Sequence, residues 1–208
     1  MAVLFITCGV PGAGKTTVAK RLEREHHALR LTPDEWLREL FPQEKTGVGA
    51  AIRAAIEELH WSTALRALEI GCNVVLDYGL WGRSERDRFR SEARALGAQV
   101  VLCFLDPPRE ELIRRLAARN ADLPAGTFHI AEQKLEDALA TLQRPTPEEL
   151  ALFDQLPPDA SIEPPTLHPR HEADDVRERR TAEAIDRLVV VGNDDEVVRR
   201  SNQPLKKD

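Results

Sequence analysis

The chain alternates short apolar runs with longer stretches in which apolar residues recur at helical spacing. The apolar runs are residues 3–7, 28–31, 73–77 and 99–105. Their apolar character is nearly continuous, which is typical of strands covered on both faces. Strands that alternate with helices in this way predict an α/β fold of three layers, with a mostly parallel central sheet, right-handed crossovers and helices on both faces. Ligands of such sheets bind beyond the carboxyl ends of the strands.

The longest of the helical stretches covers residues 50–70, and Gly71 supplies its stop. Its apolar positions at helical spacing are Ile52, Ile56, Leu59, Thr63 and Leu68. This spacing predicts that these five side chains form the buried face of one helix.

A second helix is expected over residues 84–96. A capping box from Ser84 to Asp87 opens it, and Gly97 ends it. The row of Arg86, Arg90 and Arg94 is interleaved with acidic residues. That alternation predicts a solvated helix face.

Composition and charge narrow the class of protein. The chain has 208 residues, 42% of them hydrophobic, which suits one globular domain with a substantial core. A net charge of −6 argues against broad binding to nucleic acid or to an anionic membrane.

The sequence contains no apolar stretch long enough to span a membrane, and its N-terminus lacks the positively charged region of a signal peptide. We therefore expect a cytoplasmic protein, and the oligomeric state is left open. Cys8, Cys72 and Cys103 lie far apart beside apolar runs, so we expect buried, reduced thiols.

The chain changes character after about residue 145. Seven prolines fall between Pro145 and Pro169, and residues 170–187 are dense in both signs of charge. We therefore expect one domain over residues 1–155, followed by a proline-rich, charged and largely mobile segment over 156–208. The apolar run at 188–191 could add one edge strand.

The strongest motif follows the first predicted strand directly. Residues 9–17 read GVPGAGKTT, a complete phosphate-binding loop. Glycines let the backbone N–H groups surround phosphate oxygens, Lys15 adds a mobile positive charge and the Thr16 hydroxyl can bind Mg²⁺. The sequence thus predicts binding of ATP, or another nucleoside triphosphate, together with Mg²⁺. The loop residues expected at the nucleotide are Gly9, Gly12, Ala13, Gly14, Lys15, Thr16 and Thr17.

A candidate general base lies where the second predicted strand ends. Thr32 as N-cap, Pro33 at the first helical position and Glu35 make a capping box. Capping does not require Asp34, which lies at the ligand-binding edge of the sheet. A carboxylate there can accept the proton of an attacking hydroxyl.

The third predicted strand ends in a second carboxylate, Asp77, which can hold Mg²⁺ directly or through water. Most of the few Trp and Tyr residues follow this strand or lie near Asp34, and aromatic walls with a few polar groups suit a small-molecule pocket. The residues expected on the acceptor side are Trp36, Arg38, Asp77, Tyr78, Trp81 and Arg83.

Two arginines one helical turn apart suggest a lid over residues 109–130. Arg115 and Arg119 share a helical face, and the following loop contains Pro124 and Gly126. A mobile arginine near a phosphoryl group stabilises charge that develops in the transition state. Alternatively, the two arginines belong to a solvated face paired with Glu110 and Glu111. We place Arg115 at the nucleotide and Arg119 at the transferred phosphate.

Taken together, the loop at 9–17, Asp34 with a nearby aromatic, Asp77 and the Arg115/Arg119 helix resemble the small P-loop kinases. This group includes the polynucleotide 5′-kinase domain, zeta toxins and chloramphenicol phosphotransferase, and the resemblance covers residues 1–155. It implies that Asp34 is the general base and that Arg119 contacts the transferred phosphate. Polynucleotide kinases carry an arginine three residues after that Asp, whereas this chain has Leu37 there and Arg38 next.

The sequence therefore predicts a kinase that transfers the γ-phosphate of ATP to a hydroxyl of a small molecule, with Lys15, Asp34 and Arg119 as catalytic residues. A polynucleotide 5′-hydroxyl kinase is the alternative enzyme. An alternative of another class is a nucleotide-dependent switch or binding module with weak ATPase activity.

Overall fold

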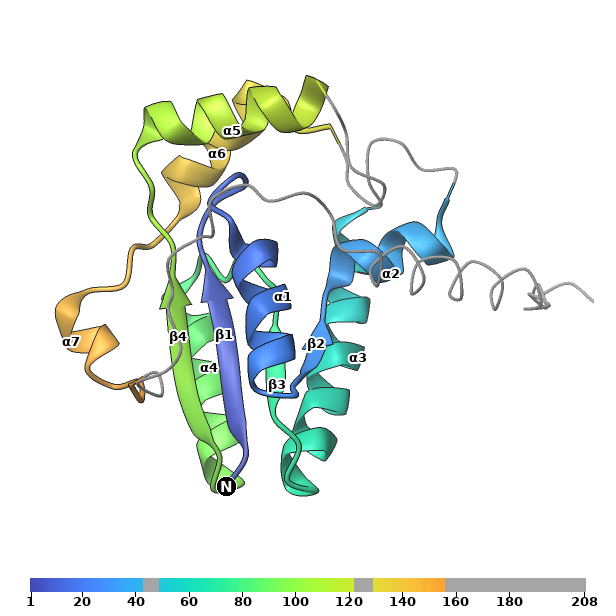
Figure 1. Cartoon of the computed structure of the whole chain (residues 1–208), viewed down its shortest axis with the longest axis vertical. Coiled ribbons are helices and arrows are strands. Elements are labelled where there is room, and N and C mark those ends of the chain that lie inside the picture. Colours follow the sequence, from blue (N-terminus) through green and yellow to red (C-terminus); the bar gives the residue numbers. More distant parts are fainter. Residues whose placement is uncertain (43–48, 122–128, 156–208) are drawn as a thin grey trace, which may run out of the picture. The chain divides into compact units, whose positions relative to one another are not determined.

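The computed structural model describes residues 1–42, 49–121 and 129–155, all of which lie in the unit Met1–His168. Four parallel strands form one sheet in the order β2-β3-β1-β4. They are β1 (Val3–Cys8), β2 (Leu29–Leu31), β3 (Val74–Leu76) and β4 (Gln99–Phe104). Each strand lies within a predicted apolar run or extends it by one residue. The predicted α/β architecture is confirmed (Figure 1).

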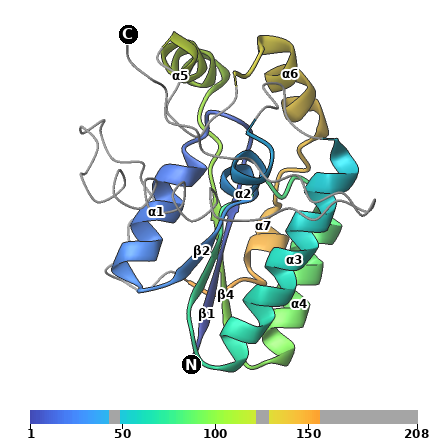
Figure 2. The ribbon, with the colours of Figure 1, turned by 90° about the vertical axis from the view of Figure 1, so that its right-hand side faces the viewer.

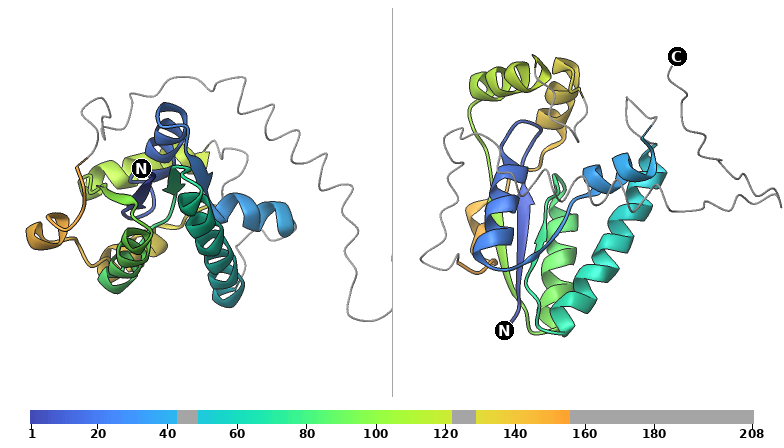
Figure 3. Two further views of the ribbon diagram at one scale, coloured as in Figure 1. Left: turned by 90° about the horizontal axis from the view of Figure 1, so that it is seen from below. Right: turned by 45° about the vertical axis from the view of Figure 1, so that its right-hand side comes forward.

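Seven helices are described around this sheet. They are α1 (Lys15–Glu25), α2 (Pro33–Leu40), α3 (Ala50–Glu69), α4 (Arg83–Ala95), α5 (Arg109–Ala121), α6 (Glu132–Thr141) and α7 (Pro147–Leu150). Figures 1 and 3 show α1 on one face of the sheet and α3 and α4 on the other. Helices α5 and α6 lie beyond the carboxyl ends of the strands, where Figure 2 shows them above β1 and β4.

The core forms where the strands meet these helices. Ile6 lies in the middle of the sheet, in register with Leu76 on β3 and Leu102 on β4. It is fully buried, as are Val18 and Ala19 on α1. Burial on both faces explains the nearly continuous apolar sequences of β1, β3 and β4, whereas the edge strand β2 has an exposed Leu29.

The buried face of α3 differs from the prediction. Ile56 and Leu68 are buried as expected, but Ile52 and Leu59 are 41% and 59% exposed, and Thr63 is exposed too. The inner face is instead completed by His60, Trp61, Ala64 and Ala67. Small alanines let α3 approach closely, and the two polar rings are buried because each finds a hydrogen-bond partner.

Helix α4 also corrects two expectations. It begins one residue early, and the Glu85 carboxylate accepts from the Gly82 N–H at 3.0 Å, so Ser84 and Asp87 do not form the cap. Arg86 does not face solvent but is fully buried. Its guanidinium donates to both carboxylate oxygens of Glu149 on α7, at 2.7 and 3.0 Å.

All three cysteines are free; Cys8 and Cys103 are buried, whereas Cys72 is exposed at the turn before β3, contrary to expectation. Within the described ranges, none of the helices has the length and apolar character needed to cross a bilayer. The predicted segment 156–208, its edge strand at 188–191 and residues 122–128 of the lid lie outside the described residues.

Candidate active site

The phosphate loop connects β1 to α1 and has the backbone that its glycines allow. Gly14 is the N-cap of α1 with a φ of 98°, a left-handed conformation that favours glycine. At Gly12, with a φ of 83°, an added Cβ would lie 3.1 Å from the Leu116 side chain. Helix α5 therefore packs directly on the loop, which leaves no room for a side chain there.

Lys15 opens α1 at the end of this loop. Its Nζ donates to the Val10 carbonyl at 2.9 Å. Burial lowers the pKa of Lys15, and the carboxylates of Asp77 and Asp34 oppose that shift. Two carboxylates that come from different elements thus favour the charged form of Lys15.

Asp77 follows β3, and its side chain is only 2% exposed. Its Oδ1 accepts from the Thr16 hydroxyl at 3.3 Å, and its Oδ2 accepts from the Thr32 hydroxyl at 3.3 Å. Burial raises the pKa of Asp77, while Arg30 and Lys15 oppose that shift. A hydroxyl and a carboxylate in contact at the end of a phosphate loop are oxygen donors of the kind that Mg²⁺ prefers, so the residues fit this ion.

Arg30 joins this group, although it is not among the residues predicted for the site. Its side chain is 6% exposed, with Nε 2.9 Å from Glu23 Oε2 and Nη2 2.7 Å from Glu35 Oε1. Its Nη1 contacts the Thr32 hydroxyl and lies 3.5 Å from Asp77 Oδ2. An arginine inside the apolar run 28–31 was the signal that could have revealed it.

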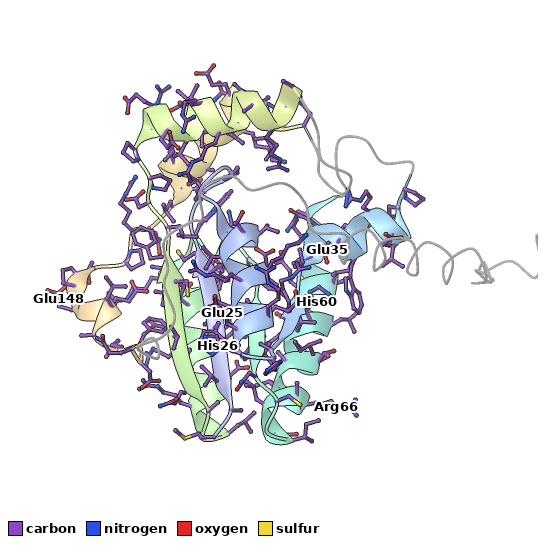
Figure 4. All side chains as sticks on the ribbon, in the orientation of Figure 1. Glu25, His26, Glu35, His60, Arg66 and Glu148 are labelled. Atoms are coloured by element: carbon purple, nitrogen blue, oxygen red, sulfur yellow. The ribbon has the colours of Figure 1, made fainter. Side chains whose placement is uncertain are left out.

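The same contacts overturn the predicted capping box at the start of α2. The N-cap Thr32 has no side-chain capping bond, because its hydroxyl is engaged by Arg30 and Asp77. Glu35 pairs with Arg30, and Figure 4 marks Glu35 beside α2. These side chains hold the carboxyl ends of β2 and β3 together.

Asp34 lies in the first turn of α2, and its side chain is 52% exposed. Arg53 of α3 donates from Nη2 to Asp34 Oδ1 and from Nη1 to Glu57 Oε1, the latter at 3.1 Å. Arg53 could not be recognised as a site residue from the sequence, because it falls outside the apolar spacing of its helix. The structure thus gives Asp34 a cationic partner from a neighbouring helix.

Helix α5 brings its two arginines to the phosphate loop. Arg115 Nη1 lies 3.3 Å from the Ala13 carbonyl, and its Nε lies 2.7 Å from Glu111 Oε1. Burial lowers the pKa of Arg119, and the charge of Asp34 opposes that shift. The charge of Asp34 therefore acts on both Lys15 and Arg119, the other two predicted catalytic residues.

The residues predicted for the acceptor side separate in the structure. Tyr78 lines a cavity of about 180 Å³ together with Ala54, Glu57, Glu58, Leu80, Glu85, Arg88 and Phe89. Trp81 instead donates to the Gly9 carbonyl at 3.0 Å and supports the phosphate loop.

The other residues predicted for the acceptor side do not line this cavity. Trp36 is 46% exposed and packs edge-on against His60. The N–H of Arg83 binds the Gln143 side chain, and Arg38 is half-buried on α2.

Comparison with known proteins assigns the chain to a protein family. A family model described as an AAA domain matches residues 4–145, more than half of the chain. The chain belongs to this family. It is a P-loop kinase-like domain with a nucleotide-binding fold, which confirms the resemblance to the small P-loop kinases.

Relatives of this P-loop kinase-like domain include a guanylate kinase of Streptomyces coelicolor, 29% identical over 182 residues, which cover 77% of this chain and 84% of that protein. A second guanylate kinase, from Streptomyces kasugaensis, matches at the same identity, over 77% of this chain and 83% of that protein.

Among solved structures, Chaetomium thermophilum Kti12 in complex with ADP and AlF3 has a TM-score of 0.54 at 16% identity, over 88% of this chain and 96% of Kti12. The Pnkp1/Rnl/Hen1 RNA repair complex gives a TM-score of 0.56 at 22% identity, over 83% of this chain and 53% of the matched chain. At these identities the likeness shows a shared fold.

Proposed function

We propose that this chain is an ATP-dependent kinase that transfers the γ-phosphate to a hydroxyl group of a small molecule. The observation that carries the proposal is the position of Asp34. This carboxylate lies in the first turn of α2, at the edge of the sheet that also holds the phosphate loop, and its charge acts on the Lys15 ammonium and the Arg119 guanidinium. A hydroxyl is a poor nucleophile until a base takes its proton, so a carboxylate at the phosphate site suits a hydroxyl acceptor.

Each residue then has a defined task. The loop amides and Lys15 bind the β and γ phosphates, and Arg115 orders the loop through its bond to Ala13. Asp34 takes the acceptor proton as the new oxygen–phosphorus bond forms and the bond to the ADP oxygen breaks. Arg119 stabilises the charge that develops on the transferred group. Thr16 and Asp77 would hold Mg²⁺, which neutralises phosphate charge when bound.

The charge of the cavity beside Tyr78 favours an uncharged or cationic acceptor over an anionic one. The cavity beside Tyr78 is lined by three carboxylates, from Glu57, Glu58 and Glu85, and by one arginine, Arg88. Arg88 is already paired with Glu58, at 2.7 Å from both of its amino groups. Acidic walls repel a phosphorylated acceptor such as a nucleoside monophosphate or a polynucleotide.

The guanylate kinase relatives still make a nucleoside monophosphate the acceptor to test against this proposal. Such an acceptor is already an anionic nucleophile and does not need a base at Asp34. The identity of the acceptor therefore distinguishes a kinase that phosphorylates a hydroxyl group from one that phosphorylates a nucleoside monophosphate.

A transfer screen with γ-labelled ATP tests the proposal. The panel comprises nucleosides, sugars, aminoglycosides, a 5′-hydroxyl oligonucleotide and GMP, with the Lys15→Ala variant as the inactive control. We expect label on an uncharged or cationic hydroxyl compound and none with Lys15→Ala, because Lys15 bridges the phosphates during transfer. Label on GMP or on the oligonucleotide would select the corresponding alternative, and slow phosphate release without any transfer would indicate a switch.

A further inference from the structure

Arg53 bridges two acidic side chains on the acceptor side of the phosphate loop. It lies in the first turn of α3 and contacts Asp34 on α2 through Nη2 and Glu57, one turn further along α3, through Nη1. The Arg53 side chain is 44% exposed and that of Glu57 is 32% exposed. One guanidinium thus ties the candidate base to the wall of the cavity beside Tyr78.

The other charges near Asp34 come from different elements. Lys15 at the start of α1 and Arg119 on α5 act on it electrostatically, and Glu57 adds a negative charge beside Arg53. Lys15 and Arg119 have tasks at the phosphates. Arg53 instead makes a direct hydrogen bond to Asp34, and nothing in the phosphate chemistry requires it.

An exposed aspartate at a helix start has free side-chain rotation, but a general base must present one oxygen to the acceptor. The Arg53 bond uses Oδ1, so Oδ2 is the oxygen that we assign to the acceptor proton. The Glu57 contact fixes the other end of the guanidinium and prevents it from swinging toward the phosphates.

We propose that Arg53 is the positioning residue for the Asp34 base, with Glu57 as its anchor. This role rests on the proposed function, since it needs Asp34 to act as a base. It predicts that Arg53 matters for the rate of transfer and not for the binding of ATP.

A double-mutant cycle tests the assignment, using γ-labelled ATP and the compound of the transfer panel that is phosphorylated fastest. Because misplacing a reacting group by about 1 Å can cost ~10²-fold, we expect Arg53→Gln to lower kcat by about 10- to 100-fold. The KM for ATP should stay within about twofold, since losing an interaction that matters only in the transition state leaves the binding of ATP in the ground state unchanged. In the Asp34→Asn background, the same Arg53→Gln change should cost less than about threefold, because residues that act as a unit are not additive.

Two further variants complete the cycle. Arg53→Lys should recover part of the rate, because the ammonium still pairs with Asp34. Arg94→Gln is the matched control, since Arg94 is an arginine of similar exposure that pairs with Asp154 at 3.2 Å, and Asp154 also binds the N–H of Val100 in β4. It should leave kcat unchanged.

The outcomes distinguish a failure of the role assigned to Arg53 from a failure of the proposed kinase function. If Arg53→Gln keeps the rate, or costs the same factor with and without Asp34, Arg53 does not position the base and the assignment is wrong. If Asp34→Asn alone keeps the rate, or no panel compound is phosphorylated, the proposed function fails first and the role of Arg53 falls with it.

Discussion

The buried side chain of Arg30 links three separate segments of the chain at the edge of the sheet. It contacts residues of α1, α2 and the turn after β3, through Glu23, Glu35 and Asp77. Asp77 is nearly inaccessible to water, so its charge depends on neighbours for stabilisation. Arg30 thereby couples the stability of the fold to the geometry of the metal-binding oxygens.

We predict that Arg30→Leu lowers the free energy of unfolding by about 3 kcal/mol, because removing one partner of a buried ion pair leaves the other charge uncompensated. Urea denaturation measures this loss. The control Arg94→Leu removes an exposed ion pair and should change the free energy by less than about 0.5 kcal/mol. A loss below about 1 kcal/mol for Arg30→Leu would show that Lys15, Thr16 and Thr32 stabilise Asp77 without Arg30.

His60 is a second buried polar residue with a measurable consequence. It is fully buried between Trp36 and Tyr78, with its Nδ1 3.1 Å from the Tyr78 hydroxyl, and Figure 4 marks it on α3. Burial lowers the pKa of His60 to about 4. The unfolded chain, with an ordinary histidine pKa, binds a proton at a pH where the native protein does not.

His60 therefore stabilises the fold above its ordinary pKa of about 6.5, and this contribution is lost as the pH falls toward 4. We predict that the lowered pKa of His60 makes the free energy of unfolding about 2 kcal/mol smaller at pH 5 than at pH 7. Urea denaturation at the two pH values should show a smaller change in His60→Gln than in the parent protein. Equal changes in both would mean that the pKa of His60 is the same in the native and the unfolded protein.

At the scale of elements, the strands were predictable and the helix faces were less so. Continuous apolar runs mark buried parallel strands almost without ambiguity, and the glycine pattern of the phosphate loop marks both its conformation and the start of α1. Helix faces are harder because Ile52 and Leu59 look buried but are exposed.

Arg86 was misjudged for a related reason. Its partner Glu149 lies 63 residues further along the chain. Local spacing carries no information on such a long-range pair, and the same holds for Arg53 with Asp34. The positions of Asp34 and Asp77 at the strand ends could thus be predicted, whereas the pairing of Asp34 with Arg53 could not.

The pair of Arg86 and Glu149 attaches α7 to α4 and to the chain that follows β3. Arg86 also donates to the Leu80 and Gln143 carbonyls, at 2.9 Å each. Glu149 is 1% exposed, so its removal leaves a guanidinium buried without a carboxylate.

We predict that Glu149→Ala lowers the free energy of unfolding by about 4 kcal/mol. Its neighbour Glu148, marked in Figure 4, serves as the matched control, and Glu148→Ala should leave the denaturation midpoint unchanged. If both substitutions had equal effects, the helical propensity of α7 and not the buried pair would be responsible.

At the scale of the molecule, one edge of the sheet gathers the phosphate loop, Asp34 and Asp77 because every strand is parallel. The described residues already contain a sheet covered on both faces and a buried Phe153 near their end. Residues 170–187 offer few apolar side chains by sequence. We therefore propose that folding and nucleotide binding reside in the unit that ends at His168.

We predict that a chain truncated after His168 keeps its melting temperature within about 2 °C of the full chain, since a loss of 1 kcal/mol shifts a protein of this size by roughly 2–4 °C. Its affinity for ATP should also be retained. Scanning calorimetry and nucleotide titration of both chains measure the two quantities. A fall of many degrees would assign part of the core to the C-terminal segment.

The most direct test of the account is the rate of phosphoryl transfer by Asp34→Asn. Asparagine keeps the shape and the helix start but cannot accept the proton, so we expect kcat to fall by about 10²- to 10⁴-fold while ATP affinity hardly changes. Asp137→Asn is the control, because Asp137 is an exposed aspartate that accepts from Gln133 on the same helix, and it should leave the rate unchanged. A rate within a few-fold of the parent protein in Asp34→Asn would contradict the assignment of Asp34 as the base, and with it the proposed hydroxyl kinase.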